Sequence, residues 1–320
     1  MKKLLALLIV AIMAISLTAC VPTPGDINDI VNDALNELEN DVIPDSDLDA
    51  DNNNDSDADT DSDNTDENVS VDVNSSIAEQ VVYDENNIKV TATELTYEEY
   101  YGPTISFLVE NNSDKDISVS TENVTVNNIV FSAYMYSDLK AGKKAYSDMS
   151  FYETDLASYG ITEIGTIEFN LHIYETETYD DIDDSDVIKL IVNDDVSFVP
   201  APKGDKIYSK NGITVYTEKC NKEDDDYYDY VTRLFIVNES DKYISVRCED
   251  VSVNGFMLDP YCSAAVPAGK MAYSNLYFYQ SDLDDNKIDK IEEVEFYLDI
   301  YDYNTYDDID ESEVITIKAD

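Results

Sequence analysis

The chain has 320 residues, of which 70 are acidic and 20 are basic, so its formal net charge is −50. Binding to nucleic acid requires clustered Lys and Arg that neutralise phosphates, so this composition argues against nucleic acid as a partner, and equally against a basic patch for anionic lipid headgroups. The charge favours solubility and attraction to cations or basic surfaces, but it does not indicate a fold.

The first segment, residues 1–20, has the pattern of a secretory signal. Lys2 and Lys3 precede an apolar run over residues 4–15, which is too short to span a bilayer. The next residues, Leu17-Thr18-Ala19-Cys20, resemble the bacterial lipobox. That resemblance implies cleavage before Cys20 and a diacylglyceryl anchor on its sulfur, which would hold the protein on the extracellular face of the cytoplasmic membrane. An ordinary signal peptide with a chance cysteine is the alternative.

Residues 21–44 are predicted to contain a short juxtamembrane helix. Apolar residues recur at spacings of three and four, and Pro44 is a plausible stop. The polar side of this helix is acidic, which favours packing on a neighbour over insertion among lipid headgroups.

Residues 45–77 form an Asp-rich linker that is predicted to be disordered. Its Asp, Asn, Ser and Thr residues cannot bury apolar surface, and its like charges repel one another. The simple interpretation is a stalk between the lipid and the rest of the chain. The alternating acids from Asp55 to Asp63 raise the alternative of calcium binding, but the Gly and Glu of an EF-hand loop are missing from this run.

The remainder of the chain is an internal repeat with an offset of 127 residues. The pairs Gly142/Gly269 and Phe169/Phe296 show the register. A repeat unit of this length is a domain, so we expect module 1 at residues 78–193, a linker at 194–205 and module 2 at 206–320. Each module has about 115 residues, near the size of an immunoglobulin-like domain.

Both modules have the alternation of β-strands. In the strand expected at residues 167–173, apolar and polar side chains alternate with a period of two, and residues 294–300 repeat the pattern. Asn127-Asn128 and Asn254-Gly255 indicate hairpin turns, and residues 154–164 indicate a single helical turn. The predicted fold class is therefore all-β: two tandem antiparallel immunoglobulin-like β-sandwiches. The chain has no Trp, so the core of antibody domains is absent.

Several motifs occur in both modules: N-x-S-D-K-x-I-S-V, V-x-V-N-[NG], A-G-K, I-x-F-x-L-x-I-Y and T-Y-D-D-I-D-x-S-x-V-I, with Phe169 and Phe296 in the fourth. This set resembles uncharacterised extracellular immunoglobulin-like modules on lipoproteins of Gram-positive, Clostridia-type bacteria. The resemblance implies a fold and a location at the cell surface, and it carries no known activity.

A repeated acidic cluster is the weak candidate for a metal site. It consists of carboxylates in corresponding loops of the two modules: Asp180, Asp181 and Asp183, and Asp307, Asp308 and Asp310. Oxygen ligands in a loop suit Ca²⁺, and a cation would relieve the crowding of like charges. The spacing matches no defined calcium loop, so a solvated acidic loop is the favoured interpretation and no metal or cofactor is expected.

Histidine and cysteine are the two further residue types that could carry chemistry. The single histidine, His172, is expected on an outward face, and module 2 has Asp299 in its place, so catalysis is not expected from it. Three cysteines, Cys220, Cys248 and Cys262, occur in module 2 only. A Cys220–Cys248 disulfide outside the cell and buried free thiols both remain open.

Tyrosine is abundant, with 25 residues, and it gathers in one loop of each module. We expect these loops to form a weak candidate contact surface; their tyrosines are Tyr97, Tyr100 and Tyr101, and Tyr227, Tyr228 and Tyr230. The alternative is that the rings cover the edge of the core.

The expectation for function is a lipid-anchored surface protein whose modules bind a glycan, a wall component or another protein without catalysis. A structural spacer is the second candidate. A calcium-dependent module or a wall-acting hydrolase is less favoured, because no nucleophile–base pair, phosphate loop or cofactor motif recurs in both copies.

Overall fold

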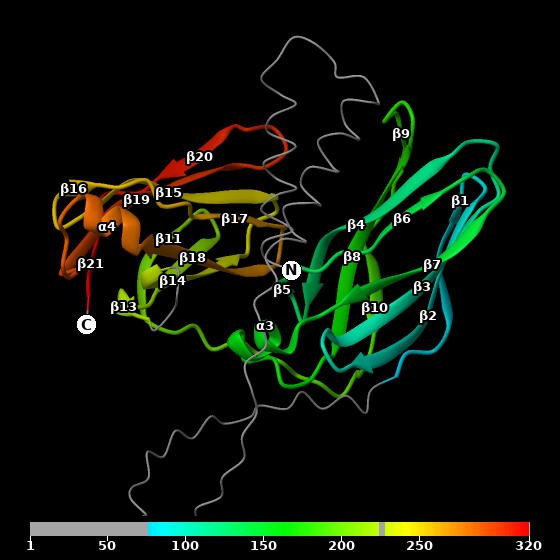
Figure 1. Cartoon of the computed structure of the whole chain (residues 1–320), viewed down its shortest axis with the longest axis horizontal. Coiled ribbons are helices and arrows are strands. Elements are labelled where there is room, and N and C mark those ends of the chain that lie inside the picture. The colour runs from blue at the N-terminus through cyan, green and yellow to red at the C-terminus, as the bar shows by residue number, and fades with distance from the viewer. Residues whose placement is uncertain (1–75, 224–227, 320) are drawn as a thin grey trace, which may run out of the picture. The chain divides into compact units, whose positions relative to one another are not determined.

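The alternating segments fold as β-strands in the computed structural model, which describes residues 76–223 and 228–319 (Figure 1). The predicted all-β fold class is confirmed. The signal peptide with Cys20, the helix predicted at 21–44 and the acidic linker up to residue 75 lie outside the described residues.

In module 1 the elements follow one another with short connections. They are β1 (Gln80–Glu85), β2 (Ile88–Glu98), β3 (Gly102–Asn111), β4 (Ile117–Val126), β5 (Ile129–Val130), β6 (Tyr136–Leu139), β7 (Lys144–Ser150), α3 (Glu153–Ser158), β8 (Thr166–Glu175), β9 (Asp181–Asp184) and β10 (Ile188–Ile191).

Module 2 repeats this order and adds one short strand, β13. Its elements are β11 (Asp205–Lys210), β12 (Ile213–Thr217), β13 (Asn221–Lys222), β14 (Tyr228–Asn238), β15 (Ile244–Val253), β16 (Phe256–Met257), β17 (Ser263–Val266), β18 (Met271–Tyr279), α4 (Gln280–Asp285), β19 (Glu293–Asp302), β20 (Asp308–Glu311) and β21 (Ile315–Lys318).

Each module packs two antiparallel sheets against each other. In module 1 one sheet has the order β1-β2-β3-β7, and the second contains β10, β8 and β4 with β5, β6 and β9 at its edges. Module 2 repeats both groups, as β11-β12-β14-β18 and as β15 and β19 with their smaller partners. The repeated sequence therefore produces a repeated topology.

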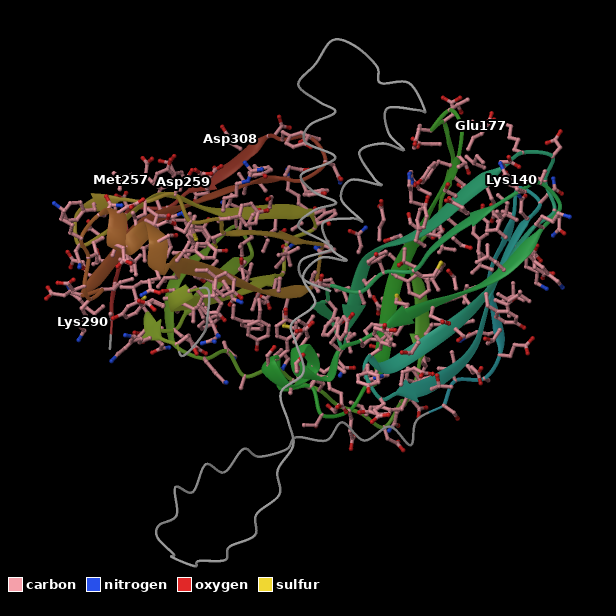
Figure 2. All side chains as sticks on the ribbon, viewed as in Figure 1. Lys140, Glu177, Met257, Asp259, Lys290 and Asp308 are labelled. Carbon is pink, nitrogen blue, oxygen red and sulfur yellow. The ribbon has the colours of Figure 1, made fainter. Side chains whose placement is uncertain are left out.

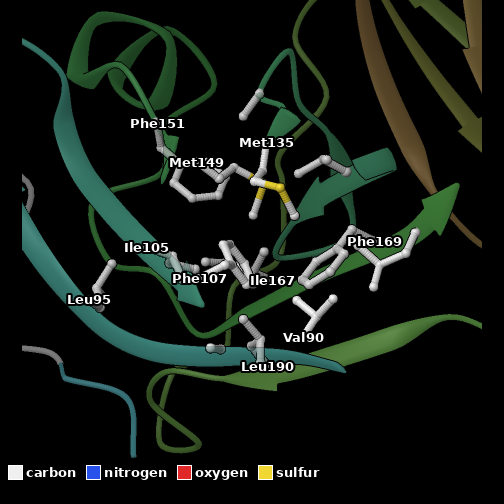
Figure 3. Close-up of a cluster of buried hydrophobic side chains, with 14 of the residues drawn as sticks. Val90, Leu95, Ile105, Phe107, Met135, Met149, Phe151, Ile167, Phe169 and Leu190 are labelled. Atoms are coloured by element: carbon white, nitrogen blue, oxygen red, sulfur yellow. The ribbon is translucent and has the colours of Figure 1, made fainter. Parts of the chain in front are cut away.

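The core of each module lies between its sheets. β8 has strictly alternating burial, with Ile167, Phe169, Leu171 and Ile173 fully buried. The ring of Phe169 meets that of Phe107 from β3 edge-to-face, with centroids 5.7 Å apart, which is a favourable geometry for aromatic pairs (Figure 3). Residues 77–190 and residues 208–317 supply two separate apolar clusters, one per module.

The turns and the helix also follow the sequence pattern. Asn127 and Asn128 have φ of 50° and 68°, and Asn254 and Gly255 have 51° and 83°, the positive values that a two-residue hairpin turn of this type requires. The predicted helical turn is α3, and Leu156 anchors it in the core with full burial.

A buried asparagine closes one end of each module. The Asn111 side chain is fully buried and donates to the carbonyls of Lys115 and Leu139, at 2.7 and 3.3 Å, while its oxygen accepts from Ser113. Asn238 repeats this arrangement on Lys242 and Val266 in module 2. One side chain thus satisfies backbone groups of two separate connections, which holds the β3–β4 and β6–β7 turns together.

The two modules contact each other within one compact unit of the described residues. Met271 of β18 pairs with Ile129 of β5 in parallel, and its N–H donates to the Asn128 carbonyl at 3.0 Å. The rings of Tyr159 and Tyr273 stack with centroids 4.7 Å apart. The sheet of one module consequently continues into a sheet of the other.

Across the described residues, helices are short, and none has the length and apolar character needed to cross a membrane.

Replacing Asn111 by Ala should lower the free energy of unfolding by about 2–4 kcal/mol, because buried carbonyls lose their donor. Asn238→Ala should have an effect of similar size in module 2. The neighbouring Asn112 has an exposed side chain, so Asn112→Ala should change stability by less than about 0.5 kcal/mol. Urea denaturation measures all three, and equal effects of the Asn111 and Asn112 substitutions would contradict the proposed role of the buried amide.

Candidate functional site

The repeated acidic clusters join β9 to β1 and β20 to β11. In module 1, Asp183 accepts hydrogen bonds from the Tyr83 hydroxyl at 2.5 Å and from the Asn86 amide at 3.0 Å. In module 2, Asp310 accepts from the Tyr208 hydroxyl at 2.8 Å and forms an ion pair with Lys210. One carboxylate of each cluster therefore has a structural partner within its own module.

The remaining carboxylates of these clusters do not converge. Asp181 lies 3.8 Å from the His172 ring, Asp307 accepts from the Thr305 hydroxyl, and Asp180 and Asp308 are exposed, as Figure 2 shows for Asp308. Within residues 76–223 and 228–319, no group of three His, Cys, Asp or Glu side chains is placed to hold a metal ion. The geometry gives the calcium hypothesis no support in these loops.

The Tyr–Asp pairs also change the titration of their members. Burial, followed by the hydrogen bond to Asp183, raises the pKa of Tyr83 well above its usual range, and burial with Asp310 does the same for Tyr208. In turn, the Tyr208 hydrogen bond and the ion pair with Lys210 hold the pKa of the Asp310 carboxyl below its ordinary value. The hydroxyls remain protonated and donate their hydrogen bonds, so these tyrosines link β1 to β9 and β11 to β20.

His172 has a partner that the sequence did not reveal. Its Nδ1 lies 2.7 Å from the Asp184 carboxylate, across the β8–β9 pairing, and its ring is 5.2 Å from that of Tyr174. In module 2 the position is Asp299, opposite Glu311. A His–Asp pair that its own duplicate lacks does not define a catalytic centre shared by the modules.

The three thiols of module 2 are all buried. Burial raises the pKa of the Cys220 thiol to about 11. The structure places Cys248 against Cys262, with their sulfurs 3.0 Å apart, instead of against Cys220 as one of the sequence alternatives held. Strand pairing explains this contact, because Cys248 on β15 lies opposite Cys262, the residue immediately before β17.

The predicted tyrosine loops differ between the modules. Tyr97, Tyr100 and Tyr101 are exposed at the β2–β3 turn, as predicted. In module 2, Tyr227 lies outside the described residues, Tyr228 packs its ring on Tyr277, and Tyr230 is 4% exposed. The prediction of a contact surface is wrong for Tyr230, because alternation along β14 turns this residue into the core.

On module 1, exposed tyrosines line an open groove with a volume of about 350 Å³. We call it the tyrosine groove; its residues come from the β2–β3 turn, the β5–β6 connection, β6, β7 and the start of α3, and they are Tyr101, Ser132, Ala133, Tyr134, Tyr136, Asp148, Ser150 and Tyr152. The rings of Tyr101 and Tyr152 contact each other with centroids 6.2 Å apart. Tyr134 is the most exposed of these rings, at 72%.

Neighbouring strands fix the polar groups of the tyrosine groove. Asp148 accepts from the Ser106 hydroxyl at 2.7 Å, and Ser150 accepts from Thr104 at 3.0 Å, both across the β3–β7 pairing. The Tyr136 hydroxyl donates to Asp138 at 2.7 Å. These hydrogen bonds hold the polar side chains of the groove in place, and side chains held in this way lose little entropy in any contact.

The corresponding strand face of module 2 lines a second cavity. This inter-module cavity has a volume of about 530 Å³ and is lined by Asp155, Ser158, Tyr159, Lys203, Glu218, Arg233, Tyr273, Asn275 and Tyr277. Tyr273, Asn275 and Tyr277 are the repeat equivalents of Tyr146, Asp148 and Ser150. The same face of β7 and β18 thus borders a tyrosine-lined cavity in both modules.

Most residues of the tyrosine groove were not predicted from the sequence. Of its tyrosines only Tyr101 was predicted, because Tyr134, Tyr136 and Tyr152 follow it in the chain only after three or more strands. Exposed and buried side chains alternate strictly over residues 131–137. This period of two is typical of an extended segment, and it places Tyr134 and Tyr136 on the exposed side.

No family model matches the chain, and no curated protein matches it. Among solved structures, a protein of unknown function from Porphyromonas gingivalis W83 is similar to 73% of this chain over 98% of its own length, with 11% sequence identity and a TM-score of 0.22.

Where the modules meet, Glu168 of module 1 binds two lysines. Lys270 of module 2 contacts one carboxylate oxygen and also donates to Asn128 at 2.9 Å, while Lys189 lies 3.1 Å from the other oxygen. Burial alone would raise the pKa of Glu168, but the hydrogen bonds from the two lysines outweigh it and lower the pKa. The side chains of Glu168 and Lys270 are 12% and 16% exposed, so water screens this pair only weakly.

Replacing Lys270 by Ala should lower the free energy of unfolding by about 1–2 kcal/mol near neutral pH, since charge-assisted hydrogen bonds between the modules are lost. The equivalent Lys143→Ala in module 1 is the matched control and should be nearly neutral, because this lysine is exposed. The native pKa of Glu168 is depressed, so its contribution is present above about pH 4.5 and is lost as the pH falls further. Urea denaturation at pH 7 and pH 3 tests this: a difference between wild type and Lys270→Ala that persists undiminished at pH 3 would refute the assignment.

Proposed function

We propose that this chain is a lipid-anchored surface protein whose two immunoglobulin-like modules bind a ligand at the cell exterior without catalysis. The anchor is the diacylated Cys20, and the acidic linker over residues 45–77 separates the lipid from the modules. The resemblance of the repeated motifs to modules of Clostridia-type lipoproteins supports the same location.

The observation that carries the binding role is the recurrence of a tyrosine-lined cavity on the same strand face of both modules. Tyrosine rings provide rigid contact area with a hydroxyl at one end, and they lose little conformational entropy on binding. A spacer needs neither feature. Exposed rings around fixed Asp148 and Ser150 instead have the composition of a recognition surface.

Charge restricts the ligand of the tyrosine groove. The groove carries one carboxylate, Asp148, and no basic side chain among its lining residues, and the chain as a whole is strongly acidic. Both facts disfavour anionic polymers. A neutral or amine-bearing saccharide fits best, because its C–H faces pack on tyrosine rings while its hydroxyl or ammonium groups donate to Asp148.

Substituting Tyr134 or Tyr152 by Ala should weaken saccharide binding about tenfold each, which corresponds to roughly 1.4 kcal/mol per ring. Binding is measured with the chain after residue 20 on an array of neutral, amino and acidic oligosaccharides, followed by calorimetry on the strongest of them. The matched control is Tyr261→Ala, because Tyr261 is the module 2 equivalent of Tyr134 and is 82% exposed. It should leave affinity unchanged.

If folded wild-type protein binds no oligosaccharide and no purified wall polysaccharide above background, the spacer function is favoured. Equal losses from Tyr134→Ala and Tyr261→Ala would place binding outside the tyrosine groove.

The proposed anchor is tested separately. In cells grown with an alkyne-bearing fatty acid, the wild-type protein should become labelled. Cys20→Ser should abolish the label and release the protein into the medium, because a chain without acyl groups has no stable attachment to the membrane. Cys220→Ser is the control for loss of a cysteine and should remain labelled. Labelling of Cys20→Ser to the wild-type level would exclude this cysteine as the anchor.

A further inference from the structure

Two thiols of module 2 face each other across adjacent strands. Cys248 lies on β15, and Cys262 immediately precedes β17, with the pairing Arg247↔Ser263 next to them. The Cys248 N–H donates to the Cys262 carbonyl at 3.2 Å, and the two sulfurs are 3.0 Å apart. Bond formation requires a sulfur–sulfur distance of about 2.05 Å, so the sulfurs need to approach by only about 1 Å.

Module 1 shows that this backbone arrangement belongs to the fold and does not depend on the sulfurs. At the equivalent positions, the Thr121 N–H donates to the Met135 carbonyl at 3.0 Å, and the Met135 N–H donates to the Thr121 hydroxyl at 2.7 Å. Module 1 has a hydroxyl and a thioether side chain at the two positions where module 2 has cysteines. Strand pairing therefore brings any two side chains at these positions together, and in module 2 both of them are thiols.

Both thiols are 7% exposed, and Cys220 is fully buried, so all three are protected once the module has folded. Close contact with Cys248 lowers the pKa of the Cys262 thiol, whereas the pKa of Cys248 is raised by the same contact and by burial. These shifts belong to the folded module, in which burial keeps both thiols away from an external disulfide.

We propose that Cys248 and Cys262 form a disulfide within module 2 when the chain folds in the presence of an oxidising disulfide. The thiolate of one of the two cysteines attacks one sulfur of that disulfide, forms a mixed disulfide and expels the first thiolate. The thiolate of the other cysteine then attacks the cysteine sulfur of the mixed disulfide and expels the second. Two cysteine thiols lose two electrons and two protons, and the oxidant is reduced to two thiols.

This bond links β15 to the segment that enters β17, and it closes a short loop over residues 248–262. Closing such a loop restricts the unfolded chain and raises thermal stability. Cys220 stays outside the bond, in agreement with its separate position against the end of the chain, where it forms a β-bridge with Ala319. Export to the cell exterior matters for this disulfide only because it supplies the oxidant. The disulfide can therefore form whether or not the modules bind a ligand.

Tryptic mapping of the refolded full chain reads the bond directly. Cleavage after Arg247 and Lys270 releases one peptide, residues 248–270, that contains both cysteines, while Cys220 appears separately in peptide 220–222. The reduced, unfolded chain is refolded in a glutathione buffer poised near −200 mV, then denatured and alkylated. The expected result is peptide 248–270 without alkyl groups and lighter by two hydrogen atoms, with Cys220 fully alkylated.

The disulfide should also raise the thermal stability of the protein. A reductant should lower the Tm of the oxidised protein by roughly 5–10 °C. It should have no effect on a Cys248→Ser/Cys262→Ser double variant, and Cys220→Ser should behave as wild type. Peptide 248–270 that is alkylated on both cysteines after complete refolding would overturn the proposal, and so would a disulfide that joins Cys220 or two separate chains.

Discussion

The period-two alternation of each strand is the constraint on which the rest of the structure depends. It sends every second side chain of β8 into a core that the opposite sheet closes, as the edge-to-face contact of Phe107 with Phe169 shows. The same alternation leaves the intervening residues on the outer face, where packing does not restrict their identity. A functional surface on this fold is therefore built from residues that the core does not use.

The fold could be predicted from the sequence because its signals are local. Alternation, Asn-Gly and Asn-Asn turns and the 127-residue repeat each depend on residues close in the chain or on direct comparison of two segments. The site depends on pairings between distant segments. Nothing in the sequence near Tyr101 indicates that Tyr134 and Tyr152 lie beside it, because the pairing of β3 with β7 and the contact of β6 with β7 decide this.

The wrong prediction for Tyr230 and the open pairing of the cysteines have the same origin. Tyr230 stands in a Tyr-rich, acidic loop by sequence, but β14 begins at Tyr228 and its alternation turns Tyr230 inward. Spacing in the chain left Cys220–Cys248 open as a pair, whereas β15 and the segment before β17 bring Cys262 to Cys248. In both cases the strand register decides which side chains meet, and a one-residue change of register reverses the outcome.

Duplication has allowed the two copies to diverge where the core permits it. Phe169 and Phe296 occupy the same buried position, and Asn111 and Asn238 make the same buried hydrogen bonds, because each change there would leave a cavity or an unsatisfied carbonyl.

On the outer face the copies differ in charge. Asp148 of module 1 corresponds to Asn275 in module 2, whose cavity also contains Lys203 and Arg233. The same cavity also contains Asp155 and Glu218, so its two cations stand beside two carboxylates. The two cavities consequently present different charged groups: a single carboxylate in the tyrosine groove, and carboxylates together with cations in the inter-module cavity.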